Sequence, residues 1–231
     1  VATGVYRRGA RVPITILPLG TGNGLARVLG LPLEPRETLT ALAQGRLVDL
    51  DLIDVVSHDI VSLLFFGAGL DATINREADG EQKERLGWLA YVTAALGSLG
   101  SVKNHDITLT LDGRAERVRG HTVSAFNATR LRVAGVEVGP DADPHDGVMR
   151  VTVMRSTNAL VSLAQVLRLM NRSASRTELT AVTSLELDAS PPLPVQVDGD
   201  VVGETPVLAR VVPAAVTFVA DAGYEEERAG E

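Results

Sequence analysis

The sequence predicts part of an α/β domain followed by a sandwich or barrel of mostly antiparallel strands. One observation is a glycine-rich turn at residues 18–27, which joins an apolar segment to a short segment with helical character. Another is a series of short apolar segments from residue 48 onward, separated by turn signals such as Asp112-Gly113 and Asp198-Gly199. Two segments with helical spacing interrupt this series, and we expect them to cover the sheets.

The glycine-rich turn is the first element that could bind a ligand. Residues 12–17 predict a strand that has Pro13 near its edge and ends at Pro18. Glycine permits positive φ and a close approach of backbone N–H groups to a ligand. A helix starting at Asn23 would add unpaired N–H donors. The candidate anion-binding residues are Gly20, Thr21, Gly22, Asn23 and Gly24. A tight turn that binds nothing is an equally weighted alternative.

Past this turn, the pattern predicts one helix and then strands. The helix covers residues 37–44, with Leu39, Leu42 and Ala43 on one side, and Gly45 ends it. Residues 48–53 alternate in polarity, which places Asp49 and Asp51 on the same face of a strand. A turn at 57–59 returns the chain through residues 60–66 as a hairpin.

The remaining pattern completes the sandwich. Further strands are expected at 107–111, 118–126, 148–154, 179–187, 195–197 and 207–219, and the two covering helices at 86–99 and 160–167. We place the domain boundary at Leu47. This gives residues 1–47 to the α/β part, 48–220 to the sandwich and 221–231 to an acidic tail.

Composition narrows the function classes. The 231 residues carry a net charge of −7 with only 3% aromatic residues, which argues against a nucleic-acid partner. The absence of cysteine excludes disulfides and thiolate chemistry and suits a cytoplasmic protein. No apolar run reaches the roughly 18 residues of a transmembrane helix. No lysine follows the glycines in the way a P-loop requires, and the spacing does not match the dinucleotide fingerprint.

Three acidic groups are candidates for chemistry. Residues 141–148 place three aspartates and a glycine before a strand, which suits Mg²⁺ or Ca²⁺, although an ordinary Asp-Gly turn is the favoured interpretation. Residues 197–200 offer Asp198 and Asp200 as a general base or as a simple turn. Asp49 and Asp51 would ordinarily mark a solvated sheet face.

The order of these motifs resembles the diacylglycerol kinase catalytic-domain family, which includes bacterial lipid kinases and the sphingosine and ceramide kinases. The resemblance covers nearly the whole chain. It rests on Pro18-Leu19-Gly20-Thr21-Gly22-Asn23-Gly24-Leu25-Ala26-Arg27, Val48-Asp49-Leu50, Gly69-Leu70-Asp71-Ala72, Leu86-Gly87-Trp88-Leu89-Ala90-Tyr91, Asp146-Gly147-Val148-Met149-Arg150-Val151 and Val197-Asp198-Gly199-Asp200.

The resemblance implies a role for each matching residue. Gly20, Thr21, Gly22 and Asn23 would contact ATP, and Asp49 would join a water and Mg²⁺ network. Asp146 would bind a structural Mg²⁺ together with the backbone carbonyls of Asp143 and Val148. Asp198 and Asp200 correspond to the family's Asp-Gly-Glu motif, which contains the proposed base. Asp200 is one methylene shorter than the usual glutamate, and Gly24 replaces a frequent aspartate.

The function implied by the resemblance is ATP-dependent phosphorylation of a lipid hydroxyl such as that of diacylglycerol. The enzyme would associate peripherally with the membrane, with Arg155, Arg168, Arg172 and Arg176 as a candidate headgroup patch or as ordinary charges near helix ends. A homodimer is one possible oligomeric state. The family's first nucleotide loop would precede residue 1, so we expect this piece alone to be inactive. The alternatives are a non-catalytic lipid- or protein-binding sandwich and an enzyme related to NAD kinase.

Overall fold

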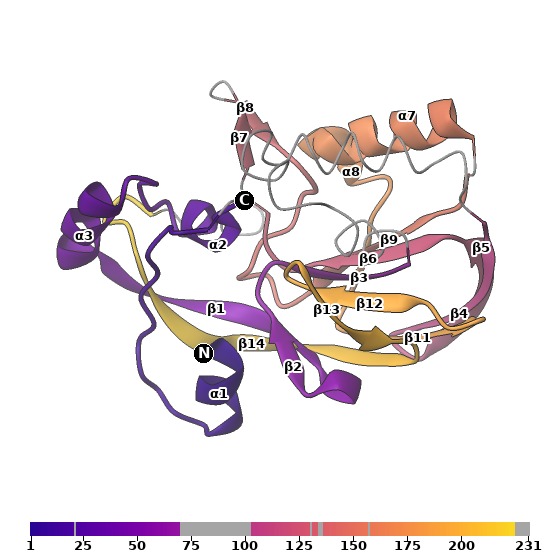
Figure 1. Cartoon of the computed structure of the whole chain (residues 1–231), viewed down its shortest axis with the longest axis horizontal. Coiled ribbons are helices and arrows are strands. Elements are labelled where there is room, and N and C mark those ends of the chain that lie inside the picture. The colour runs from indigo at the N-terminus through magenta and orange to yellow at the C-terminus, as the bar shows by residue number, and fades with distance from the viewer. Residues whose placement is uncertain (21, 70–102, 130, 134–135, 157, 225–231) are drawn as a thin grey trace.

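The computed structural model describes residues 1–20, 22–69, 103–129, 131–133, 136–156 and 158–224. Two six-stranded sheets dominate these residues (Figure 1). Sheet A has the order β2 (Ile60–Ser62), β1 (Arg46–Val55), β14 (Val207–Ala220), β11 (Ser184–Ser190), β4 (His105–Leu111) and β5 (Arg114–Gly120). Sheet B has the order β10 (Thr180–Val182), β9 (Met149–Met154), β6 (Thr122–Phe126), β3 (Phe65–Gly69), β12 (Pro194–Val197) and β13 (Asp200–Glu204). Neighbouring strands in both sheets run antiparallel, which confirms the predicted sandwich.

Shorter elements surround the sheets. The N-terminal part contributes α1 (Ala2–Arg7), α2 (Gly24–Val28) and α3 (Pro35–Gln44). Helix α3 lies at the end of the molecule where β1 and β14 extend together, whereas α1 contacts β14 and β2 (Figure 1). A 3-10 turn, η1 (Val56–His58), joins β1 to β2. Helices α7 (Ala159–Met170) and α8 (Arg172–Ser175) follow β9, and the small hairpin of β7 (Leu131–Val133) and β8 (Val136–Val138) contacts α2. The helix predicted at 160–167 is therefore confirmed.

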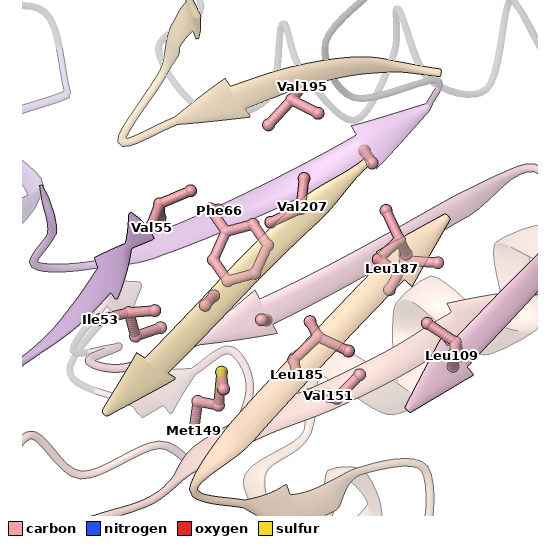
Figure 2. Packing of buried hydrophobic residues seen from close by; sticks show 14 of the residues in the cluster. Ile53, Val55, Phe66, Leu109, Met149, Val151, Leu185, Leu187, Val195 and Val207 are labelled. Atoms are coloured by element: carbon pink, nitrogen blue, oxygen red, sulfur yellow. The ribbon is translucent and has the colours of Figure 1, made fainter. Parts of the chain in front are cut away.

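The main core fills the space between the two sheets. Phe66, Val195, Met149 and Val151 of sheet B pack against side chains of sheet A, and Figure 2 shows this layer from close by. The sheet A members labelled there are Ile53, Val55, Leu109, Leu185, Leu187 and Val207. Full burial of a side chain of this size contributes roughly 1.5–3 kcal/mol, so this layer stabilises the sandwich that carries the site.

A second core joins the N-terminal part to sheet A. Leu29 and Leu31 pack with Leu50, Leu52 and Phe218 of the long β1–β14 pair. This contact fixes α2, and with it the glycine-rich turn, on one end of the sandwich. Helix α3 starts from Pro35 with the Glu34 carboxylate accepting a hydrogen bond from Glu37 N at 2.9 Å, as expected for an N-cap.

Four expectations about the strands were wrong in detail. The return strand predicted at residues 60–66 is divided into β2 of sheet A and β3 of sheet B. Residues 12–17 form no strand, and only Ile14 makes a parallel bridge to Phe218. The predicted strands 118–126 and 179–187 are each divided between the two sheets, at residue 121 and at residue 183. At the first division, a Cβ on Gly120 would lie 2.8 Å from Val153 Cγ1 and 2.9 Å from Met154 O, so the close crossing requires glycine. The predicted helix at 86–99 and the acidic run at 225–227 lie outside the described residues.

Candidate functional site

The glycine-rich turn is closed by Asn23. Its Oδ1 accepts a hydrogen bond from Gly20 N at 2.9 Å, and its Nδ2 donates to Pro18 O at 3.3 Å. Asn23 takes the left-handed conformation with φ of 49°, whereas none of Gly20, Gly22 and Gly24 has positive φ, contrary to expectation. Asparagine tolerates this region because its short polar side chain bonds locally. The following helix α2 has only five residues.

Each described glycine of the turn has a different role. A Cβ on Gly22 would meet nothing within 4 Å, so its backbone is open to a ligand. A Cβ on Gly24 would lie 2.7 Å from Leu64 Cδ1, so Gly24 allows the turn to pack directly against the segment between β2 and β3. Thr21 lies outside the described residues.

The segment between β2 and β3 holds the carboxylate of Asp198. Oδ1 of Asp198 accepts hydrogen bonds from Ser62 Oγ at 2.8 Å and from Leu64 N and Phe65 N at 3.0 Å, while Oδ2 accepts one from Leu63 N at 2.9 Å. Asp198 and Gly199 both have positive φ, with values of 49° and 104°, as the predicted turn requires. The residue is exposed at the turn, but its carboxyl group points into protein. This enclosure raises the pKa of Asp198, and the four donors oppose the rise.

Asn127 connects this turn to the acidic loop at 141–148. Its Nδ2 donates to Leu63 O at 2.8 Å and to Asp51 O at 2.9 Å, and its backbone N–H donates to Leu64 O at 2.7 Å. Asn127 is fully buried, and its Oδ1 has no partner among the described atoms. One side chain therefore fixes both the Asp198 turn and the strand that carries Asp51.

Asp51 sits in a bulge that docks the acidic loop. The register of β1 against β14 shifts between Leu50 and Leu52, which turns the Asp51 side chain into the protein, where it is 3% exposed. Its Oδ1 accepts from Ala214 N at 2.8 Å and its Oδ2 from Gly147 N at 2.7 Å. The expectation that Asp49 and Asp51 share one face is wrong because this bulge interrupts the alternation. Asp49 stays exposed, and Thr217 Oγ1 donates to it at 2.5 Å.

The acidic loop itself is closed by Asp146. Oδ2 of Asp146 pairs with Arg150 Nη2 at 2.5 Å, and Oδ1 accepts a hydrogen bond from Val148 N at 3.1 Å. Burial raises the pKa of Asp146, the charge of Arg150 acts against the rise, and the nearby charge of Asp51 adds to it. Oδ1 of Asp143 accepts from His145 N at 3.1 Å. The two aspartates therefore accept hydrogen bonds from backbone N–H groups of their own loop.

The predicted arginine patch is largely neutralised by carboxylates. Arg172 and Arg176 both bind Asp141, at 2.8 Å and 2.5 Å, and Arg168 pairs with Glu178 at 3.1 Å. Burial acts to raise the pKa of Asp141, but the bonds and charges of these two arginines outweigh it and leave the pKa lowered. Among the described residues, no helix combines the length and apolar character needed to cross a bilayer.

The chain matches two protein-family models, one after the other along its length. Residues 1–55 match the diacylglycerol kinase catalytic domain, and residues 65–220 match the YegS C-terminal NAD kinase beta sandwich-like domain. The chain belongs to the diacylglycerol kinase catalytic-domain family. Relatives include a diacylglycerol kinase of Mycobacterium tuberculosis, 28% identical over 90% of this chain and 69% of that protein. An uncharacterised protein of Synechocystis is 26% identical over 90% of this chain, which spans only 49% of that protein's length.

Solved structures share the fold of this diacylglycerol kinase-family chain. A crystal structure of a diacylglycerol kinase from Bacillus anthracis superimposes with a TM-score of 0.75 at 19% identity, covering 95% of this chain and 72% of the other. At this identity the likeness shows the fold alone. Kinases of this family use ATP, generally with a metal.

The residues described at the acidic loop do not fit the structural Mg²⁺ that the resemblance implied. Magnesium needs near-octahedral oxygen ligands, whereas both Asp146 oxygens already accept bonds from Arg150 and Val148. Over the described residues, no group of three or more His, Cys, Asp or Glu side chains is arranged to hold a metal.

Of the predicted site residues, the structure joins Asp198 to the glycine-rich turn through Leu64, and Asp146 to the same region through Asp51 and Asn127. Asp200, exposed at the start of β13, follows Asp198 directly after Gly199. Sequence reasoning missed the roles of Ser62 and Asn127 and assigned Asp51 to a solvated face. A lone asparagine after a strand carries no local signal, because its partners are up to 76 residues away.

Proposed function

We propose that this chain forms the greater part of an ATP-dependent lipid kinase, which transfers the γ-phosphoryl group to a lipid hydroxyl such as that of diacylglycerol. The boundary proposed for it stays at Leu47, so that residues 1–47 bind nucleotide and residues 48–220 present the acidic groups. The supporting observation is the contact of Gly24 with Leu64, because it sets the glycine-rich turn against the segment that holds Asp198.

The nucleotide end of the site is assigned to the glycine-rich turn. Gly22 leaves its backbone open to a phosphate oxygen, Asn23 holds the turn closed around Gly20, and Thr21 would add a hydroxyl donor. We assign Asp49 to a water network around the metal that accompanies ATP. The extended segment that leads to the turn supports this assignment, since Ile14 N donates to Thr217 O at 2.9 Å and Thr217 binds Asp49.

The acceptor end is assigned to Asp198 and Asp200. A carboxylate there would accept the proton of the lipid hydroxyl while the hydroxyl oxygen attacks the γ-phosphorus of ATP. ADP would leave from the opposite side of the phosphorus. Asp198 has an enclosed carboxyl group that is held by four donors. Asp200 is exposed at the same turn. We therefore assign positioning and proton transfer to this pair without dividing the two roles.

A groove beneath α7 is not assigned to the acceptor. It has a volume of about 690 Å³ and is lined by β4, β5, β9 and α7, including Leu109, Val151, Val161 and Arg168. It borders β9, which lies two strands away from β3 in sheet B, whereas Asp198 lies at the β12–β13 turn on the other side of β3.

The test is a transfer assay on the full protein that contains this chain. Labelled ATP is supplied with vesicles carrying diacylglycerol, sphingosine or monoacylglycerol, and separately with NAD in solution. Label is expected on a lipid. Asp198→Asn and Asp200→Asn are each expected to lower kcat by about 10²–10⁴-fold, whereas the exposed Asp106→Asn should leave it unchanged. Melting temperatures separate loss of chemistry from loss of fold. Label on NAD alone, or full activity in both variants, would overturn the proposal.

A further inference from the structure

The strand that follows the acidic loop at 141–148 supplies a cation to it. Arg150 lies at the second position of β9, four residues after Asp146, and its Nη2 reaches Asp146 Oδ2 at 2.5 Å. The Asp146 side chain is 7% exposed and that of Arg150 is 23% exposed. We infer that the Arg150 guanidinium takes the place of a bound divalent metal ion at this loop, so that the loop is ordered without one.

The turn that precedes β9 brings the two charges together. Gly147 has φ of 73°, and Val148 N donates back to Asp146 Oδ1 at 3.1 Å, so the chain reverses within one residue. Arg150 then points back toward the carboxylate. The guanidinium is always protonated, so its positive charge beside Asp146 is present across the working pH range.

The neighbouring carboxylates are already bound to the protein. Asp51 uses Oδ1 for Ala214 N and Oδ2 for Gly147 N, and Asp143 uses Oδ1 for His145 N. A divalent ion at Asp146 Oδ2 would have to displace the Arg150 guanidinium. Ca²⁺ takes six to eight oxygen ligands and Mg²⁺ takes six.

The placement of Arg150 also carries a cost. Its Nη1 is buried and has no partner among the described atoms. Leaving a buried donor unsatisfied costs free energy. The ion pair of Nη2 with the largely buried Asp146 carboxylate offsets that cost. This inference does not depend on the kinase function, because it concerns the loop in the absence of any nucleotide.

The experiment measures thermal unfolding of the unmodified protein in EDTA, in MgCl2 and in CaCl2, with no ATP present. The expected result is the same melting temperature in all three, and no heat of binding when either metal is titrated into the protein. A melting temperature that rises with metal concentration and falls in EDTA would overturn the inference. Ligand that binds only the folded state must raise its stability once its concentration exceeds Kd.

A pair of variants sharpens the test. Arg150→Asp leaves two acidic side chains facing each other, and we expect its melting temperature to fall in EDTA and to be restored by Mg²⁺ or Ca²⁺. Arg119→Gln is the matched control, since Arg119 pairs with Asp106 at 3.3 Å with both side chains largely exposed. Its melting temperature should equal that of the unmodified protein and should not change when Mg²⁺ or Ca²⁺ is added. If Arg150→Asp fails to fold, the measurement on the unmodified protein still decides the matter.

Discussion

A buried carboxylate, Asp54, ties the first helix to the sandwich, and its removal should be costly. Its side chain in β1 is 1% exposed. Arg7 Nη2 of α1 reaches Asp54 Oδ1 at 2.6 Å, while Tyr6 OH donates to Oδ2 at 3.2 Å and Arg210 Nη2 lies 3.4 Å from the same atom. Arg7 also binds Asp59 at 2.9 Å through Nε. The perturbation is Asp54→Asn, which keeps the shape and removes the charge.

The expected loss can be bounded from this geometry. A hydrogen bond to a charged group contributes about 1.5–3 kcal/mol, and breaking a fully buried ion pair costs about 3–5 kcal/mol. The Arg7 side chain is 31% exposed and keeps Asp59 as a partner, so water and Asp59 solvate part of the charge left behind. We therefore expect about 2–3 kcal/mol. For a chain of this length that corresponds to roughly 4–12 °C in Tm.

The effect depends on pH in a defined direction. Burial alone would raise the pKa of Asp54, but the hydrogen bond and charge of Arg7 outweigh it, and the pKa is lowered relative to the unfolded chain. The stabilisation is therefore complete above the ordinary aspartate pKa of about 3.9. It is lost as pH falls below that value, through the folded-state pKa. The difference between the unmodified protein and Asp54→Asn should shrink over the same range.

The assay is urea unfolding in a double-mutant cycle with Arg7→Gln. The coupling energy between residues 7 and 54 should exceed about 1 kcal/mol, whereas the exposed Arg119 and Asp106 pair, treated in the same way, should couple by less than that. If the two cycles give the same small coupling, burial of Asp54 does not have the energetic consequence argued above.

Three further predictions follow from the bulge and the glycine-rich turn. Ala214→Gly should raise the free energy of unfolding by about 0.5–1 kcal/mol, because Ala214 has a φ of 46° that glycine adopts without strain. Urea unfolding measures the change, with Ala215→Gly as the control. Equal destabilisation by the two substitutions would contradict the prediction. Asp51→Asn should cost about 2–3 kcal/mol because it leaves one of two backbone donors facing an amide N–H₂ group, whereas Asp49→Asn should change calorimetric stability little. Gly24→Ala should lower kinase activity by pushing Leu64 away, and the added substitution Leu64→Ala should restore part of it; a Gly24→Ala variant with unchanged kinetics would contradict the proposed contact.

The sequence predicted those parts of the fold that depend on local chemistry. Asp112-Gly113 and Asp198-Gly199 both adopt positive φ at the expected hairpin turns, because Asp and Gly tolerate this region and few other residues do. The divided strands were not predictable from alternation. Strand-forming residues lie on both sides of Gly120 and Thr183, and the opposing strands decide where the chain leaves one sheet for the other.

In the candidate site too, some residues were predictable from local sequence and others depend on distant contacts. Asp198 and the glycine-rich turn carry strong local signals, whereas the segment that receives the Asp198 carboxylate lies 133–136 residues away in sequence. Asp51 was misassigned because a bulge is a property of two paired strands, and its cause, the left-handed Ala214 of β14, lies 163 residues away. No pattern within β1 indicates it.

Buried carboxylates of this chain act as connectors between distant elements. Asp51 joins the acidic loop to β14, Asp54 joins α1 to β1, and Asp198 joins the β12–β13 turn to the segment after β2. Each accepts hydrogen bonds from residues far away in the sequence, so its replacement is expected to lower stability as well as to change chemistry. An acidic residue of this site is therefore assigned to catalysis only when a variant loses turnover while keeping its melting temperature. Asp200 is exposed and directly follows Gly199, so its replacement should affect turnover with the least effect on melting temperature.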